Sequence, residues 1–182
     1  MAAAIDAKYD LIGTCAITFI ELNRFERARW FLEPNKESEF AKSSYADIAL
    51  RENRVDLART LIEKGAYESM GSTAYFLALL RKAPRSEIHR AAEEYVARWR
   101  EDSDSEPKLY VGIDLAYGGE NELSLSMLRR ALEDGYIICS AMDHASALDP
   151  LRANPEFIAL RGQAIERQKS FLAHRAERGR VS

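Results

Sequence analysis

Small side chains recur along this chain at a spacing of about thirty residues, and this spacing constrains the fold more than any other feature. They stand at Ala28, Ala58, Ala91 and Ser124, which are 30, 33 and 33 residues apart. Four positions after each of them, on the same face of a helix, comes a larger residue: Leu32, Ile62, Tyr95 or Leu128. A period of this length is typical of helical repeat proteins.

Three of these four units have a second small residue twelve positions earlier, at Ala16, Ala46 and Gly112. Small residues at both places allow two antiparallel helices to approach closely, while the larger residues fill the space between neighbouring pairs. The third unit departs from the pattern. It has Leu79 where a small residue is expected and Lys82 where a large apolar one is expected.

Helical periodicity dominates the chain, and the sequence lacks sustained apolar and polar alternation of the kind that marks strands. We predict helices over residues 5–22, 24–33, 37–52, 54–65, 70–82, 86–100, 106–117, 120–134, 137–147 and 155–177. The links between them are too short for anything but antiparallel neighbours. The sequence therefore predicts an all-α single domain over residues 1–182. Its parts are hairpins at about 5–33, 37–65, 70–100 and 106–134, a cap at 137–177 and a basic tail at 178–182.

Two prolines five residues apart mark the end of the predicted stack. Asp149 and Asn154 each stand directly before a proline, and both residue types are good N-caps. Proline is favoured at the first helical position because its missing N–H would be unpaired there anyway. We therefore expect a short helical turn to start at Asp149 and the last long helix to start at Asn154.

Composition places the chain among folded proteins that do not span membranes. Its 182 residues are 47% hydrophobic and 30% charged, enough for one core. No apolar run approaches the ~20 residues of a membrane span, and the start lacks the pattern of a signal peptide. We expect a cytoplasmic location, and we predict that Cys15 and Cys139 are buried thiols.

Charge argues against nucleic acid as a partner, since the net formal charge is −3. From Arg161 onward the balance reverses, with six basic residues against two acidic ones. We interpret this segment as a solvated last helix whose cations suit its own C-terminal dipole.

The repeat pattern resembles that of the tetratricopeptide repeat (TPR), whose period is 34 residues. The best match is LYVGIDLAYGGENELSLSMLRRAL, in which the matching positions are Val111, Gly112, Leu115, Tyr117, Leu128 and Ala131. The stretch LIGTCAITFIELNRFERARWFL is the next best. The resemblance covers residues 5–134 and implies a right-handed superhelix of four to five hairpins with a C-terminal capping helix. The segment DPLRANPEFIAL also looks like the end of TPR modules in some bacterial signalling proteins, such as serine/threonine kinases and nucleotide cyclases.

In that family the first helices of the hairpins line a concave face that contacts the partner. Carried over residue by residue, the resemblance implies these partner-binding candidates: Ile17, Glu21, Asp47, Arg51, Leu80, Ile113 and Tyr117. For Ile17 and Leu80 a role in the core is an equal alternative. The family's clamp for peptide carboxyl termini uses lysine and asparagine, and the matching positions hold neither.

The sequence offers little for catalysis. Its three histidines, His89, His144 and His174, lie far apart, and the paired glycines Gly118 and Gly119 lack the lysine of a phosphate loop. We expect no catalytic residue, no metal and no cofactor.

The leading hypothesis is therefore a non-enzymatic module that binds a peptide or partner domain in a helical groove, such as the regulatory end of a bacterial signalling protein. The alternative is a domain that senses a small molecule in a pocket near Asp149 and Asn154. Self-association through the first hairpin is also expected, because an uncapped repeat end presents apolar surface. An enzyme is the least favoured class.

Overall fold

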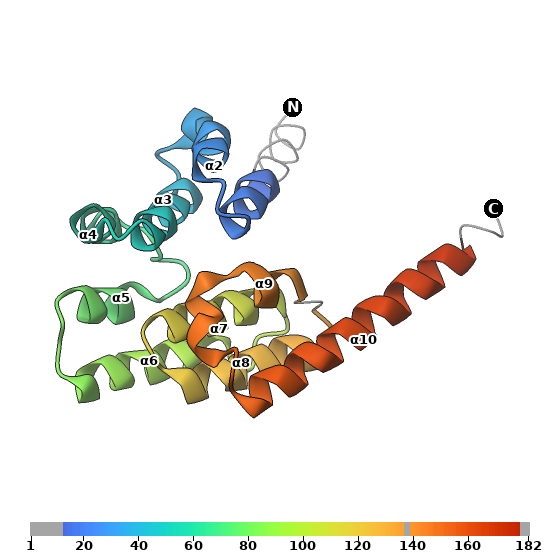
Figure 1. Ribbon diagram of the computed structural model, residues 1–182. Helices are drawn as coiled ribbons and strands as arrows, with labels where there is room; N and C mark the ends of the chain where they lie inside the picture. The colour runs from blue at the N-terminus through green and yellow to red at the C-terminus, as the bar shows by residue number, and fades with distance from the viewer. Residues whose placement is uncertain (1–12, 137–138, 179–182) are drawn as a thin grey trace. The chain divides into compact units, whose positions relative to one another are not determined.

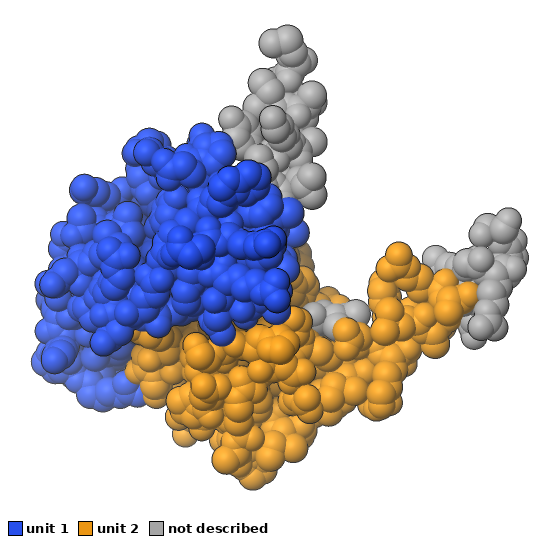
Figure 2. All heavy atoms as spheres, turned by 45° about the horizontal axis from the view of Figure 1, so that its top comes forward, with its two compact units in different colours: residues 1–91 blue, residues 92–182 orange. Residues whose placement is uncertain are grey.

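The computed structural model describes residues 13–136 and 139–178, and every element among them is helical or a turn. The chain divides into two compact units, residues 1–91 and residues 92–182 (Figure 2), with the division inside α6. Residues 5–12 of the first predicted helix, residues 137–138 and residues 179–182 of the basic tail lie outside the described part. The all-α class is confirmed, while the single domain and the right-handed superhelix stay predictions.

The helices follow the predicted order closely (Figure 1). After a helical stretch at residues 13–21, unit 1 contains α2 (Phe25–Leu32), η1 (Glu33–Asn35), α3 (Glu39–Arg51), α4 (Val55–Glu63) and α5 (Thr73–Leu80). The helix α6 (Arg85–Trp99) leads into unit 2, which contains α7 (Glu106–Tyr117), α8 (Asn121–Glu133), α9 (Cys139–His144), η2 (Ser146–Leu151) and α10 (Pro155–Arg178).

One turn geometry joins the two helices of every hairpin. The residue that reverses the chain has a positive φ in each case: Asn23 (54°), Asn53 (57°), Lys82 (55°) and Gly119 (77°). The next backbone N–H donates to the carbonyl five residues back, as in Arg24 to Phe19 at 2.8 Å and Arg54 to Ala49 at 2.8 Å. This is the Schellman arrangement, which closes one helix and reverses the chain in a few residues.

Small residues lie where the helices of a hairpin touch, as the spacing predicts. Ala16, Ala28, Ala46 and Ala58 have no exposed surface. In the fourth hairpin, the Ser124 hydroxyl donates to the carbonyl of Gly112 at 2.7 Å. A Cβ at Gly112 would lie 2.9 Å from two side-chain atoms of Leu128. The two backbones therefore approach closely only because both positions are small.

The third hairpin has a different register from the one the period predicts. In the other three hairpins the small residue of the first helix stands seven residues before the positive-φ residue. Counting back from Lys82 leads to Tyr75, which has no exposed surface, and not to Leu79. A tyrosine cannot permit the close approach that alanine or glycine permits. The third unit is thus built on aromatic packing, including stacked rings of Tyr67 and Phe76 at 4.7 Å.

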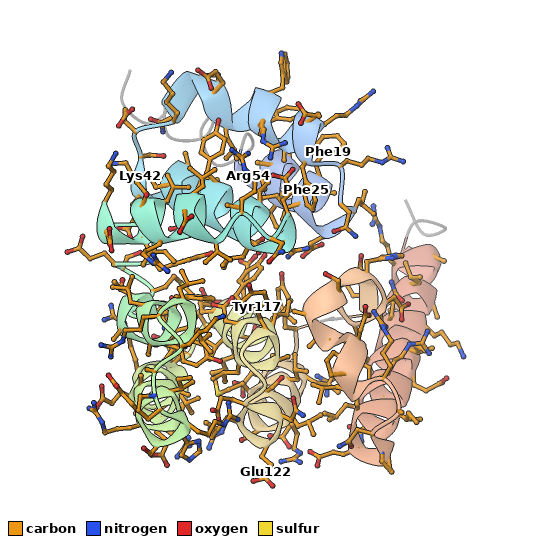
Figure 3. The ribbon with its side chains drawn as sticks, turned by 60° about the vertical axis from the view of Figure 1, so that its left-hand side comes forward. Phe19, Phe25, Lys42, Arg54, Tyr117 and Glu122 are labelled. Atoms are coloured by element: carbon orange, nitrogen blue, oxygen red, sulfur yellow. The ribbon has the colours of Figure 1, made fainter. Side chains whose placement is uncertain are left out.

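Each unit has its own apolar core. In unit 1, a cluster from the 13–21 helix, α2 and α3 centres on Ala16, Ile20, Ala28, Leu32, Ala41 and Ile48. Phe19 and Phe25 pack against it (Figure 3). In unit 2, side chains from α7, α8, α9, η2 and α10 form a single cluster. Cys139 is buried as predicted, whereas Cys15 is only half-buried.

One of the two predicted proline starts is confirmed. Asn154 caps α10, because its Oδ1 accepts from the backbone N–H of Glu156 at 2.8 Å, and Pro155 is the first helical residue. Asp149 does not start a helix. Pro150 lies inside η2, which begins at Ser146, and the Asp149 carboxylate instead accepts from Arg152 at 2.7 Å. The predicted 137–147 helix is correspondingly divided between α9 and η2.

The close approach at Gly112 gives a direct test. Gly112→Ala should lower the free energy of unfolding by about 1–3 kcal/mol, because the new methyl group must displace the buried Leu128 side chain. Gly162→Ala in α10 is the matched control, since a Cβ there meets no atom within 4 Å. It should be neutral or stabilising by up to about 1 kcal/mol. Urea denaturation followed by circular dichroism measures both, and equal stability of the two variants would contradict the packing.

The turn at Lys82 predicts a stabilising substitution. A left-handed backbone conformation is about 1 kcal/mol less favourable for lysine than for glycine. Lys82→Gly should therefore raise the midpoint of denaturation. Lys64, at the end of α4, has a φ of −92°. Lys64→Gly should therefore lower the midpoint by adding only backbone freedom to the unfolded chain.

Candidate functional site

The predicted partner-binding residues of unit 1 fall at two equivalent positions on successive first helices. Ile17 and Asp47 stand six residues before the positive-φ residue of their hairpins, and Glu21 and Arg51 stand two residues before it. Positions four apart share a helix face. Unit 1 thus presents a face, here named the first-helix face, that contains Ile17, Glu21, Asp47 and Arg51.

Asp47 and Arg51 form an ordered polar pair on this face. The Arg51 Nε donates to Asp47 Oδ1 at 3.0 Å, and its Nη1 donates to the carbonyl of Ile20 at 3.3 Å. The Arg51 side chain is 13% exposed and the Asp47 side chain 34% exposed. Arg51 therefore bridges the first two hairpins, while the carboxylate that it holds is open to solvent.

Leu80 occupies a different place in the pattern from the one assigned to it. It stands two residues before Lys82 and is thus equivalent to Glu21 and Arg51, while Phe76 is the equivalent of Ile17 and Asp47. The shift is one helical turn, so the face is the same. Both Leu80 and Phe76 are buried.

The two predicted residues of unit 2 lie in contrasting surroundings on α7. Ile113 is buried and belongs to the apolar cluster of that unit. Tyr117, at the end of α7, is 41% exposed (Figure 3). Only Tyr117 therefore presents a large surface to solvent.

Two arginines that tie neighbouring hairpins together were missed by the sequence reasoning. Arg29 bonds to Glu52 at 2.5 Å, and Arg59 donates to the carbonyl of Leu80 at 3.1 Å. Each follows the small residue of its second helix directly, Ala28 or Ala58, and each reaches the turn of the next hairpin. The repeat of an Ala-Arg pair at both positions is the signal that could have revealed them.

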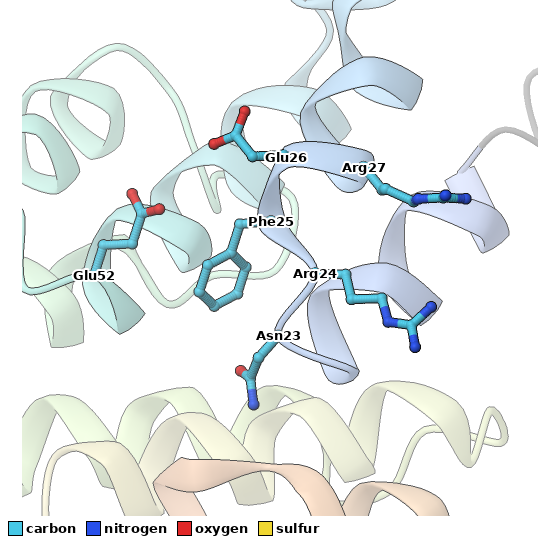
Figure 4. Close-up of a pocket in the computed structure, with 6 residues that line it drawn as sticks. All are labelled: Asn23, Arg24, Phe25, Glu26, Arg27 and Glu52. Atoms are coloured by element: carbon cyan, nitrogen blue, oxygen red, sulfur yellow. The ribbon is translucent and has the colours of Figure 1, made fainter.

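A pocket of about 520 Å³ surrounds the turn of the first hairpin (Figure 4) and is lined by Asn23, Arg24, Phe25, Glu26, Arg27 and Glu52. Its charged groups do not converge. Phe25 and Glu52 lie on one side of the start of α2, and Arg24 and Arg27 point to the other (Figure 4). This arrangement suits a shallow contact surface better than an enclosed ligand site.

A second, larger pocket of about 910 Å³ lies at the junction of α4 and α5 in unit 1. It is lined by Ile62, Glu63, Lys64, Gly65, Glu68, Gly71, Thr73, Ala74 and Leu77. Apolar side chains from both helices meet charged ones from the loop between them. Like the first pocket, it is an open depression.

Unit 2 contains a buried lysine whose charge is satisfied internally. Lys108 forms an ion pair with Asp134 and donates to the carbonyl of Asp102 at 2.6 Å. The contacts hold the start of α7 to the end of α8 and to the 101–105 segment. Since a buried ammonium group must be paired, this lysine is best explained as structural.

The described residues provide no obvious centre for chemistry. Across residues 13–136 and 139–178, no group of three or more His, Cys, Asp or Glu residues could hold a metal ion. Burial raises the pKa of the Cys139 thiol, which keeps it protonated at neutral pH. His174, exposed on α10, contacts the carbonyl of Ser170 with its Nδ1 at 2.8 Å. None of the helices within these described ranges has the length and apolar character needed to cross a membrane.

Comparison with known proteins adds one structural likeness. No family model and no curated protein matches the sequence. Among solved structures, the chain is similar to YrrB, which is described as a TPR protein with an unusual peptide-binding site. The TM-score is 0.37 and the sequence identity is 20%, over 90% of this chain and 88% of that chain. The buried small residues of its hairpins and the turn geometry that the four hairpins share are the features that make this chain a TPR-like helical repeat.

The Arg29 and Glu52 pair predicts a dependence of stability on pH. The hydrogen bond from Arg29 lowers the pKa of Glu52 in the folded state, so the pair stabilises the fold above the unfolded pKa of about 4.3. That contribution is lost as the pH falls through the lower, folded pKa. Glu52→Gln should lower the free energy of unfolding by about 0.5–1 kcal/mol at pH 7. The difference should disappear at a pH low enough to protonate Glu52 in the wild type, because both side chains are then neutral.

The control is Glu26→Gln, because Glu26 also contacts Arg29 at 2.6 Å but its side chain is 89% exposed. Urea midpoints measured from pH 7 to pH 3 compare the variants. A Glu52→Gln deficit that persists unchanged at pH 3 would mean that packing, rather than charge, joins the two hairpins.

Proposed function

We propose that the chain is a non-enzymatic interaction module that binds a peptide segment on the first-helix face of unit 1. The observation that carries the proposal is the Asp47 carboxylate. It is one-third exposed, and its position is fixed by an arginine that is itself almost buried. A fixed charge at an accessible place recognises a partner at little entropic cost.

The chemistry of the face favours a basic and apolar segment. Glu21 and Asp47 are both acidic, and the guanidinium of Arg51 is bonded to Asp47 and to the carbonyl of Ile20. Ile17 is half-buried beside them and offers an apolar contact. We assign Arg51 a positioning role, and we propose Tyr117 of unit 2 as a separate contact.

The finer setting is part of the same proposal. The C-terminal segment, with its capped α10, supports a role as the regulatory or docking end of a bacterial signalling protein. A cytoplasmic location fits that role.

The test uses a display library of random twelve-residue peptides selected on the full chain. We expect enrichment of peptides with lysine or arginine next to apolar residues. Asp47→Asn should weaken the selected peptides at least tenfold by fluorescence anisotropy, because it removes the charge while preserving the acceptor for Arg51. Asp56→Asn is the matched control, since the Asp56 side chain on α4 is 97% exposed.

Two results would refute the assignment. One is the absence of any enriched peptide that binds the purified chain. The other is equal affinity of the selected peptides for the wild type and for Asp47→Asn, which would move the site elsewhere.

A further inference from the structure

Three apolar residues seven positions apart run along the flank of α10, beside the face that packs on the core of unit 2. Ile158 is 57% exposed and Leu172 is 54% exposed, while Ile165 is half-buried because it packs at the edge of that core. Residues seven apart on a helix lie almost on one line, with a drift of about 20°. Phe157 and Leu160 fill the core instead. The three residues form what we name the outer stripe.

The second half of α10 has no support from the rest of its unit. All the described side chains of residues 166–176 are exposed. The helix extends well beyond the other elements of unit 2 (Figure 1 and Figure 2). It carries a large apolar residue besides the outer stripe, Phe171, which is 54% exposed. A helix of this kind is expected to gain stability from a partner, since isolated helices are marginal in water.

Charge is distributed very unevenly along unit 2. Residues 92–160 contain fourteen acidic and six basic side chains, a net charge of −8. Residues 161–182 contain six basic and two acidic side chains, a net charge of +4. The extended half of α10 is thus complementary in charge to the body from which it emerges.

We propose that the outer stripe is the interface of a homodimer, in which two α10 helices pack antiparallel about a two-fold axis at Ile165. A two-fold interface must be self-complementary. In this alignment Ile165 meets its own copy, and Ile158 meets Leu172 of the partner subunit. Because the order is antiparallel, the basic half of each helix lies along the acidic body of the other chain. A parallel pair would instead place two basic halves together.

Cysteine crosslinking tests both the dimer and its direction. In a Cys15→Ser background, Ile165→Cys should form a disulfide-linked dimer under mild oxidation, because residues on the axis face each other. Ile158→Cys and Leu172→Cys should each stay uncrosslinked alone. An equimolar mixture of the two should crosslink to each other. Self-crosslinking of Leu172→Cys alone would overturn the antiparallel arrangement.

Charge insertion provides the second measurement, by sedimentation equilibrium of the full chain. Leu172→Glu should weaken dimerisation at least tenfold, while Ser170→Glu, on the opposite side of the helix, should leave it unchanged. Both residues are exposed, so the fold of either variant should be intact by circular dichroism. The proposal would be overturned if the wild type stayed monomeric up to about 100 μM. That concentration is about a hundred times the dissociation constant of a typical specific dimer, about 1 μM.

One further outcome would assign the stripe to another occupant. A monomeric chain that sediments with phosphatidylserine vesicles, and loses this with Leu172→Glu, would show that α10 lies on lipid. That result would also overturn the homodimer.

Discussion

The fold depends on how closely two helix backbones can approach within a hairpin. Ser124 and Gly112 show the constraint most directly, since a hydroxyl from one helix bonds to a backbone carbonyl of the other at 2.7 Å. Any side chain at Gly112 would enter the space of Leu128. Close approach allows the larger residues that follow each small one to be fully buried, as Leu32, Ile62 and Leu128 are. The burial of those residues then joins one helix pair to the next.

The positions of the helices were largely predictable, because helical periodicity, caps and short links depend on residues that are close together in the sequence. The helical periodicity and short links located every described α-helix, although not the short helices η1 and η2, and Asn154 with Pro155 marked the start of α10. The period alone could not place the third hairpin, since Lys82 adopts a positive φ without the asparagine or glycine that signals such a turn. The register of Leu80 was therefore misjudged by one helical turn. Asp149 was misread because its carboxylate bonds to Arg152 instead of capping a helix.

The shared helix face of the candidate residues was predictable from the sequence, but their long-range contacts were not. The pattern placed Asp47 and Arg51 on one face, because residues four apart on a helix are neighbours. It could not reveal that Arg51 reaches the carbonyl of Ile20, a contact between residues 31 apart in the chain. The two residues therefore differ in role. Arg51 holds the first two hairpins together, while the Asp47 carboxylate remains accessible to a partner. Long arginine side chains make such contacts without any local sequence signal.

α10 differs from the helices of the repeated hairpins in what its two sides contact. A terminal helix normally closes a repeat array with a polar outer face. α10 meets half of this requirement, because Phe157 and Leu160 close the core of unit 2. Its flank carries Ile158 and Leu172, which are more than half exposed. Apolar residues that recur every seven positions and pass from an acidic body into a basic helix are the surface that the proposed pairing of two α10 helices would cover.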